Sequence, residues 1–425
     1  MPCGAQQGAI SDPGAFLRDL FDVALARADP MQCVPPALPP RPAGRVVVLG
    51  AGKASARMAE AVESVWGPCE GLVITRYGYG RPCQGVEIVE AAHPVPDQAG
   101  VDATGRLLSL AQTLGPDDTC VMLISGGGSA LLCAPADGLT LSDKQALGDA
   151  MLASGMPIGQ INAVRKEVSA VKGGRLAEAV YPARLVMLIV SDVPGDDPRD
   201  IASGPTVPQH SDAAHALAIL SEWGVEPPPA VARFLAAGGA PLSPEVARSV
   251  GGETRICAAP GQSLAAAAAQ ARAAGVEVRM LGDALEGEAR ELARTQAALA
   301  LEIARDGPDR PVLLLSGGEC TVTRRGKGIG GPNAEFVLAA ALALEGQPGV
   351  HVLACDTDGV DGGAEVAGAL ADPATLARAR AQGVSAQAEL EANNAHGFFA
   401  AAGGQVITGP TLTNVNDFRA FLILP

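Results

Sequence analysis

The sequence predicts an α/β protein of two domains, and three observations lead to this expectation. Apolar runs of strand length alternate with segments of helical periodicity, which is typical of parallel sheets covered by helices on both faces. Two of these runs, 120–124 and 312–315, end in a serine followed by at least two glycines. The chain has 425 residues, which is long for a single hydrophobic core.

The N-terminal half supplies the first series of alternating elements. Its strands are short β-branched or leucine-rich runs, and its helices carry apolar residues three and four positions apart. We expect strands over 45–49, 71–75, 86–90, 120–124 and 184–190, and helices over 12–28, 54–65, 101–110, 141–153 and 161–172. The proline-rich connector over 30–44 is expected to be extended and to lie on the surface.

The second series begins after a loosely patterned stretch over 227–252, which we interpret as a linker. Strands are expected over 256–258, 276–281, 312–315, 319–323 and 350–355, and helices over 263–274, 284–304 and 334–344. The domains are therefore placed at 1–245 and 253–425. The two serine–glycine loops predict two sheets whose carboxyl ends face one cleft.

Composition excludes several classes of partner. The net charge of −15 argues against nucleic acid or an anionic membrane held by bulk charge. No uncharged apolar run reaches about 18 residues, and residues 1–10 lack the pattern of a signal peptide. The nine cysteines are scattered without a Cys-x-x-Cys pair, which favours reduced thiols in a cytoplasm. We expect a cytoplasmic protein that acts on small molecules.

Two glycine loops have the composition of anion-binding turns. Residues 126–128 are glycines, so backbone N–H groups there can face an anion closely. The loop over 50–55 begins like a dinucleotide-binding turn but has Ser55 where the third glycine is required. Lys53 stands at the start of the following helix. Both phosphate binding and simple solvation of the lysine are compatible with that position.

Basic and acidic residues supply the remaining chemistry. Arg165, Lys166, Ser169 and Lys172 are expected on one helical face, either as a local positive site or as a solvated surface. Asp192 follows the strand at 184–190, where ligands bind in open α/β sheets, and can hold a divalent ion or accept a proton. The aspartates at 356, 358 and 361 predict a cation or polyol site. A lone histidine such as His93 is more often structural than catalytic.

The overall inventory favours electrostatic catalysis. The chain lacks a nucleophile elbow with a Ser-His-Asp order, and it lacks a cluster of His and Cys with metal-ligand spacing. Stabilisation by lysine, arginine and a metal ion, with little covalent chemistry, is what phosphoryl transfer requires.

Nine short segments, taken in order, resemble the class II glycerate kinases. This is the glycerate 2-kinase family, whose C-terminal half is called the MOFRL domain, and some of its members are labelled hydroxypyruvate reductase. The resemblance runs from about residue 14 to 424. The segments are GAGKAS at 50–55, HPVPD at 93–97, SGGGSALL at 125–132, NAVRKEVSAVKGGRLA at 162–177, SDVPGD at 191–196, SGPT at 203–206, SGGECTV at 316–322, TDGVDG at 357–362 and GPTLTNVND at 409–417.

The resemblance implies a reaction and an architecture. The γ-phosphoryl group of ATP would pass to the 2-hydroxyl of D-glycerate with the help of Mg²⁺, giving 2-phosphoglycerate. A Rossmann-like N-terminal domain with a mainly parallel sheet and a smaller α/β C-terminal domain would enclose the active site in the cleft between them. Lys53 matches the family's active-site lysine, and Asp192 matches the aspartate of the SDVPGD motif.

The resemblance also assigns roles to residues of this chain. Catalytic roles fall to Lys53, Asp192 and Arg165, and metal binding falls to Asp192 and Asp358. Substrate or phosphate binding is expected of Gly52, Ser125, Gly126, Gly127, Gly128, Ser129, Lys172, Gly317, Gly318, Glu319, Asn333, Asp356, Asp358, Asn414 and Asn416. The implied ligands are ATP, Mg²⁺ and D-glycerate, with no nucleic acid or membrane, and the protein is expected to be a monomer or a homodimer.

One departure from the family pattern leaves alternatives open. Many members have an arginine, a proposed transition-state stabiliser, where this chain has Pro332. Nearby Arg324, Arg325 or Lys327, or else Arg165, could substitute for it. A non-catalytic protein that binds nucleotide or sugar acid is therefore one alternative, and a hydroxypyruvate reductase using NAD(P)H is another. The missing third glycine and the absence of an acidic residue after 71–75 count against the reductase.

Overall fold

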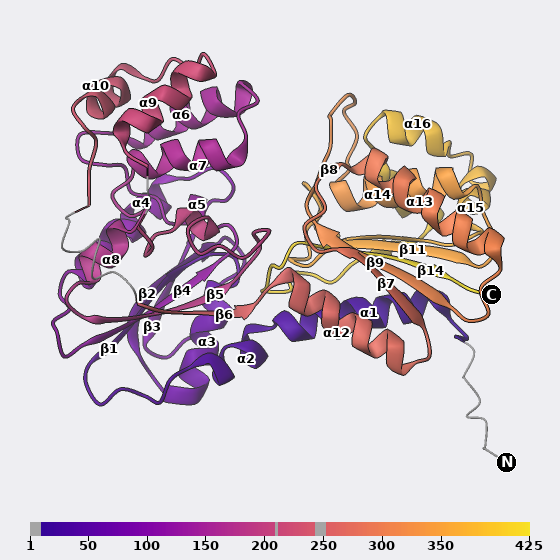
Figure 1. Ribbon diagram of the computed structural model, residues 1–425, viewed down its shortest axis with the longest axis horizontal. Coiled ribbons are helices and arrows are strands. Elements are labelled where there is room, and N and C mark those ends of the chain that lie inside the picture. Colours follow the sequence, from indigo (N-terminus) through magenta and orange to yellow (C-terminus); the bar gives the residue numbers. More distant parts are fainter. Residues whose placement is uncertain (1–9, 209–210, 243–251) are drawn as a thin grey trace. The chain divides into compact units, whose positions relative to one another are not determined.

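The computed structural model describes residues 10–208, 211–242 and 252–425 of the chain. The chain forms two compact units (Figure 1). The N-terminal unit is Pro30–Cys257, and the C-terminal unit combines Ala258–Pro425 with the residues up to Asp29.

The N-terminal unit is built on a six-stranded sheet with the order β3-β2-β1-β4-β5-β6. The strands are β1 (Val46–Ala51), β2 (Glu70–Arg76), β3 (Val86–Ala91), β4 (Thr119–Ser125), β5 (Arg184–Val190) and β6 (Glu253–Ala258). Neighbours from β1 to β5 pair in parallel, which confirms the predicted Rossmann-like arrangement. The strand order reverses between β1 and β4, which is where open α/β sheets bind ligands.

Helices cover both faces of this sheet. Alternate residues of the strands, such as Leu49 and Met122, pack with α4 (Gln98–Ala111) and α8 (Arg175–Val180). Helix α3 (Ser55–Trp66) contacts β1, β2 and β4 but lies outside that apolar cluster, and therefore covers the other face. Both β1 and β4 are buried along their whole length, which explains their continuous apolar sequences.

A group of helices in the N-terminal unit has its own apolar core. It comprises α6 (Leu141–Ala153), α7 (Ile158–Glu167), α9 (Ala213–Glu222) and α10 (Pro229–Ala236), packed around residues such as Met151 and Val164. Helix α10 shows that the linker predicted over 227–252 is partly wrong. Pro229 starts this helix at its first position, where a missing N–H costs nothing. The end of the predicted linker, 243–251, lies outside the described residues.

The C-terminal unit is built on a second sheet with the order β13-β12-β11-β14-β9-β7. Its strands are β7 (Glu277–Gly282), β9 (Val312–Gly318), β11 (Val350–Asp356), β12 (Gly368–Ala371), β13 (Gln405–Val406) and β14 (Asp417–Ile423). Only the β7–β9 pair is parallel in this sheet, so it is mixed. A small separate ladder joins β8 (Gly287–Glu288) to β10 (Cys320–Thr321).

Helices again form a layer on each face (Figure 1). One face packs against α1 (Pro13–Ala28) and α12 (Pro260–Ala273), and the other against α13 (Ala289–Asp306) and α14 (Pro332–Leu344). Three shorter helices join the second layer: α15 (Thr375–Ala381), α16 (Ala386–Glu391) and α17 (Ala395–Ala402).

Two segments lie in different units from those expected. Helix α1, expected in the N-terminal domain, packs on α12, β11 and β14, with the rings of Phe21 and Phe418 centred 5.6 Å apart. Strand β6, expected to open the second domain, joins the sheet of the N-terminal unit instead. Neither local pattern contains information about which sheet the segment will meet.

Two local expectations are also wrong. The connector over 30–44 is not extended at its start, because it contains α2 (Pro30–Cys33) and the 3₁₀ turn Pro35–Ala37. Proline at the first helical positions is already set for helical φ. The helix expected over 161–172 ends earlier, since α7 stops at Glu167 and the chain turns before α8 begins.

Candidate functional site

The loops that follow β1 and β4 are locked together at the switch point of the first sheet. The buried hydroxyl of Ser125 accepts the N–H of Ala54 at 3.0 Å and lies 3.1 Å from the hydroxyl of Ser55. The N–H of Lys53 donates to the carbonyl of Gly126 at 2.8 Å. Gly52 is required here, because an added Cβ would lie 2.1 Å from the Ser125 oxygen.

This contact places the Lys53 side chain on the glycine loop. Gly127 adopts a φ of +76° and is partly exposed, as Lys53 is. A Cβ on Gly127 would lie 3.2 Å from Cγ of Lys53 and 3.0 Å from two ring atoms of His93. The structure therefore brings Lys53 and the predicted loop 125–129 together, with His93 beside them.

The segment after the glycine loop is shorter than its sequence pattern indicates. Helix α5 (Gly128–Leu131) is a single turn, so its dipole adds little to anion binding. The loop packs instead against the turn Ile201–Ser203: a Cβ on Gly128 would lie 2.8 Å from that of Ala202. The hydroxyls of Ser129 and Ser203 are 2.8 Å apart.

The turn after β5 contains backbone conformations that are costly for residues with side chains. Ala202 and Ser203 have φ values of 51° and 63°, in the left-handed region. Such residues are uncommon outside glycine and gather at functional sites. Pairing with the segment before α8 holds this turn: Gly173 and Gly174 donate to the carbonyls of Ser203 and Gly204 at 3.1 and 2.8 Å.

Lys172 supports the glycine loop from inside the protein. Its ammonium group is buried and donates to the carbonyls of Ser129 at 2.6 Å and Leu132 at 3.2 Å. Within the described ranges no carboxylate lies within ion-pair distance of it. Burial first, and then repulsion from Lys144, lower the pKa of Lys172 well below its usual range. The expectation that Lys172 binds phosphate is not tested, but its observed partners are carbonyl oxygens.

The other basic residues of this segment do not share one helical face. Lys166 is buried and lies 3.6 Å from Asp200. Arg175 donates to the carbonyls of Lys166 and Lys172, at 2.8 and 3.0 Å. The prediction that these residues share one helical face is therefore wrong, because α7 ends at Glu167 and Lys172 belongs to the following turn. Arg165 remains partly exposed on α7, and burial lowers its pKa.

Asp192 lies at the same edge of the sheet as the two loops. Ser125 pairs in register with Val190, and Asp192 follows two residues later, half-buried. Across the described parts of the chain no three His, Cys, Asp or Glu side chains gather as a metal site. Mg²⁺ needs fewer protein ligands than that, because it commonly binds one or two carboxylates together with substrate phosphates and water. The carboxylate of Asp192 fits that requirement.

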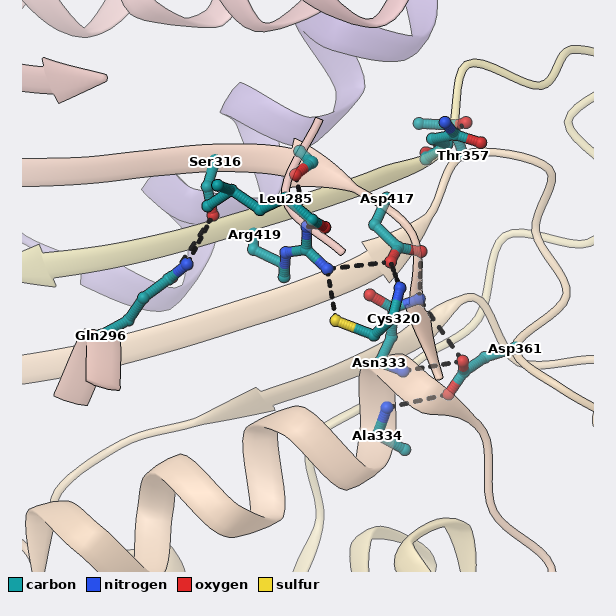
Figure 2. A network of polar contacts seen from close by, with 12 residues as sticks. Leu285, Gln296, Ser316, Cys320, Asn333, Ala334, Thr357, Asp361, Asp417 and Arg419 are labelled. Carbon is teal, nitrogen blue, oxygen red and sulfur yellow. Dashed lines mark hydrogen bonds and ion pairs between the residues drawn. The ribbon is translucent and has the colours of Figure 1, made fainter. Parts of the chain in front are cut away.

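The second serine–glycine segment, expected as a loop, is instead the end of β9: Ser316, Gly317 and Gly318 pair in register with β14. A buried ion pair on β14 lies beside it (Figure 2). Arg419 is fully buried and lies 3.1 Å from Asp417. It also donates to the carbonyls of Gly317 and Leu285, and its guanidinium contacts the Cys320 thiol. Burial raises the pKa of the Asp417 carboxyl to about 7, although Arg419 opposes the rise. The pair thus ties β14 to the end of β9 and, through Leu285, to the segment before β8.

The same network reaches the start of α14 (Figure 2). Asn333 donates to Asp417 at 2.6 Å, while Asp361 accepts the backbone N–H groups of Asn333 and Ala334 at 2.9 and 2.8 Å. Asp361 therefore caps the helix in place of Gly331, which has no side chain to do so. Pro332 occupies the first turn of α14, where proline is favoured, so its presence has a local structural reason.

The remaining predicted residues line strand ends of the C-terminal unit. Gly317 and Gly318 are buried, while Glu319 is exposed. One oxygen each of Asp356 and Asp358 accepts the N–H two residues later, at 2.9 and 2.8 Å. Asn414 accepts the N–H of Asn416 at 3.2 Å. Asp356, Asp358 and Asn414 thus brace local turns, whereas Gly317 and Gly318 end strand β9, and the roles of all of them as ligands stay predictions.

Two buried amides in this unit have unused hydrogen-bonding capacity. Oδ1 of Asn333 and Nδ2 of Asn416 are buried without a partner in the described part of the chain. Such atoms are rare in folded proteins and require an explanation, of which a bound water, ion or ligand is one. Both residues were among the predicted binding positions.

Sequence reasoning missed several residues that organise these sites. Ser203, Asp361 and Arg419 each connect segments far apart in the chain. Asp361 belongs to the aspartates for which a cation or polyol site was predicted, and Ser203 belongs to the segment SGPT at 203–206. Arg419 had no usable signal, because one arginine in a terminal apolar strand ordinarily points to solvent.

The fold and the loops define a two-unit α/β protein that presents a lysine and glycine turns at the carboxyl edge of a parallel sheet. Two family profiles match the chain: a domain of unknown function (DUF4147) over residues 16–236 and the MOFRL family over residues 312–417. The chain belongs to the MOFRL family of glycerate 2-kinase relatives, as the sequence predicted.

Relatives with this architecture carry two kinds of name. The chain is 39% identical over 401 residues to the D-glycerate 2-kinase of Thermotoga maritima, covering 93% of this chain and 94% of that protein. It is 50% identical over 414 residues to an Agrobacterium vitis protein provisionally named hydroxypyruvate reductase, covering 96% and 94%. The crystal structure of a Thermotoga maritima glycerate kinase matches with a TM-score of 0.86 at 37% identity, covering 97% of this chain and 99% of that one.

The position of Lys172 predicts that it stabilises the glycine loop. Lys172→Met removes the donor to the carbonyls of Ser129 and Leu132. Each hydrogen bond contributes about 0.5–1.5 kcal/mol, so loss of both should accelerate amide exchange over 126–132 by roughly tenfold. Lys144→Met is the control, because the hydrogen bond from Lys144 to the carbonyl of Ala134 is long, at 3.5 Å. Equal protection in both variants, measured by hydrogen–deuterium exchange, would contradict this role.

The buried pair on β14 predicts a large stability effect for a conservative change. In Arg419→Lys a single ammonium cannot reach Asp417, Gly317 and Leu285 together. Disrupting a buried pair costs about 3–5 kcal/mol, whereas an exposed pair contributes roughly 0–1 kcal/mol. Arg279→Lys is the matched control, because exposed Arg279 contacts Glu277 on β7. Urea unfolding should separate the two variants, and equal free energies of unfolding would refute the assignment.

Proposed function

We propose that this protein is an ATP-dependent D-glycerate 2-kinase that forms 2-phosphoglycerate with the help of Mg²⁺. The observation that carries the proposal is the contact of Lys53 with the glycine turn at Gly127, at the switch point of a parallel sheet. A cation and backbone N–H groups at that edge suit a phosphate or carboxylate. The names of the relatives at 39% and 36% identity, D-glycerate 2-kinase and glycerate 2-kinase, supply the substrate.

Each residue at this edge has a proposed role. Backbone N–H groups of 125–129 cradle an oxyanion, and the Lys53 ammonium neutralises charge that develops on the transferred group. Asp192 holds Mg²⁺ or accepts the proton of the glycerate hydroxyl. Arg165 is proposed as a second cation for the transition state. When bound, Mg²⁺ would neutralise phosphate charge, which is the usual contribution of a metal to phosphoryl transfer.

The C-terminal unit is proposed to supply further binding groups. Glu319, Asn333, Asn414 and Asn416 would contact substrate, as would the backbone of Gly317 and Gly318. Asp356 and Asp358 are proposed to bind substrate, and Asp358 is also a proposed Mg²⁺ ligand. The unpartnered amide atoms of Asn333 and Asn416 support these assignments.

Cellular location and assembly are also proposals. None of the cysteines in the described ranges forms a disulfide, which suits the cytoplasm that we propose. No helix within the described ranges has the length and apolar content needed to span a bilayer. We propose a monomer or a homodimer.

A hydroxypyruvate reductase is the second candidate, and the 50% identity to a relative provisionally named as one favours it. Two features weigh against nicotinamide binding. Ser55, which stands in place of the third glycine, donates to the carbonyl of Leu123 at 3.1 Å. Strand β2 ends at Arg76 rather than at an acidic residue that would hold a ribose. A non-catalytic binding protein was motivated by Pro332, for which α14 now supplies a structural reason.

The kinase proposal predicts that ADP forms from ATP only when D-glycerate and Mg²⁺ are both present. Lys53→Ala should lower kcat/KM by roughly 10²–10³-fold, because it removes a preorganised charge. Arg57→Ala is the control, since Arg57 lies on α3, which directly follows Lys53, and pairs with Glu60 at 2.9 Å. A coupled assay with enolase, which accepts 2-phosphoglycerate directly, reports the isomer.

Three outcomes would count against this proposal. Oxidation of NADH by hydroxypyruvate, without ADP formation, would replace the kinase with the reductase. Binding of D-glycerate and ATP without turnover would leave the binding protein. Full activity of Lys53→Ala would remove the lysine assignment while leaving the reaction intact.

A further inference from the structure

His93 lies against the same turn as the lysine. An added Cβ on Gly127 would lie 3.0 Å from both Cδ2 and Nε2 of His93, and 3.2 Å from Cγ of Lys53. The edge of the imidazole ring and the stem of the lysine therefore meet over one α-carbon. All three residues are partly exposed, whereas the flanking Ser125 and Gly128 are buried.

The chain holds His93 at this place from both sides. It follows β3 by two residues, at the carboxyl edge of the sheet from which the loops after β1 and β4 also emerge. Downstream, Asp97 caps α4 by accepting the N–H of Gly100 at 3.0 Å, and it also accepts the hydroxyl of Tyr77 at 2.8 Å. The segment 93–97 is thus anchored to β3, α4 and the end of β2.

This placement gives the turn two kinds of donor side chain. At Gly127 the stem of Lys53 presents its Cγ, and the imidazole of His93 presents its Cδ2 and Nε2 edge. Donors that converge on one glycine form a receptor for an oxyanion. A ring that merely filled space would need no nitrogen at this edge, and that difference can be tested.

We propose that His93 is a further substrate-contacting residue, whose imidazole N–H donates to a carboxylate or phosphate oxygen held over Gly127 beside Lys53. The inference rests on the proposed function for its substrates, and it adds a residue that neither the sequence pattern nor the kinase assignment had placed in the site. The oxygen belongs either to D-glycerate or to ATP. Separate Michaelis constants for the two substrates distinguish these sources.

Two substitutions separate contact from packing. His93→Phe keeps a flat ring but removes both nitrogens, and His93→Gln keeps an N–H donor on a flexible chain. His93→Phe should raise the KM of one substrate at least tenfold, while His93→Gln should retain part of the affinity. His215→Gln is the control, because His215 is exposed on α9. Equal Michaelis constants for both substrates in His93→Phe and the control would overturn the proposal.

A binding measurement keeps this proposal separate from the kinase proposal. The chain has five histidines, and in ¹H–¹³C spectra of histidine-labelled protein the His93 signal is the one lost in His93→Gln. D-glycerate, ATP or inorganic phosphate should shift that signal and leave the His215 signal in place. A shift without any turnover would support the His93 contact and refute the kinase. Turnover with an unmoved His93 signal would refute the contact and leave the kinase.

Discussion

The contact between Ser125 and the loop after β1 is the constraint on which the N-terminal site depends. Ser125 ends the central strand β4, and its hydroxyl binds the N–H of Ala54. The approach is so close that residue 52 must lack a Cβ. Because the two loops cannot separate without breaking this buried contact, Lys53 reaches Gly127 from a fixed start. Buried Lys172 holds the other end of the glycine loop by donating to the carbonyls of Ser129 and Leu132.

The C-terminal unit secures its serine–glycine segment, which ends strand β9, by different means. Ser316 is buried and accepts a hydrogen bond from Gln296 of α13 at 3.1 Å, so its hydroxyl is held within the unit. The strand end beyond it is held by Arg419, whose charge is compensated by Asp417 and by carbonyl oxygens. A buried guanidinium is tolerated only with such partners. The two similar Ser-Gly-Gly segments are thus held by a serine hydroxyl in one unit and by an ion pair in the other.

Sequence reasoning predicted the parts of this protein that local patterns determine. The strands around Val47 and Met122 are continuous apolar runs, and parallel pairing follows from their alternation with helices. Gly52 and Gly127 both lie where a Cβ would meet neighbouring atoms. The expectation that the glycine turn faces an anion stays a prediction. The ends of helices and the pairing partners of strands were harder to predict. Nothing local showed that α7 stops before Lys172, or that β6 would join the first sheet. The burial of Arg419 could not be predicted from the local sequence, because burial of a charge depends on partners far away in the chain.

The central claim is that the turn at Gly127 positions Lys53 and His93 on the substrate. Gly127→Ala tests it most directly, with Gly155→Ala as a matched control, because both glycines have a φ of +76° but only Gly127 has neighbours at its Cβ position. The two positions share the φ that disfavours a side chain, so the clash with Lys53 and His93 sets Gly127→Ala apart. Measured by ³¹P NMR with ATP, Mg²⁺ and D-glycerate, Gly155→Ala should form 2-phosphoglycerate at close to the wild-type rate. Gly127→Ala should lose most of that activity while remaining folded by circular dichroism. Equal rates of product formation in the two variants would contradict the account.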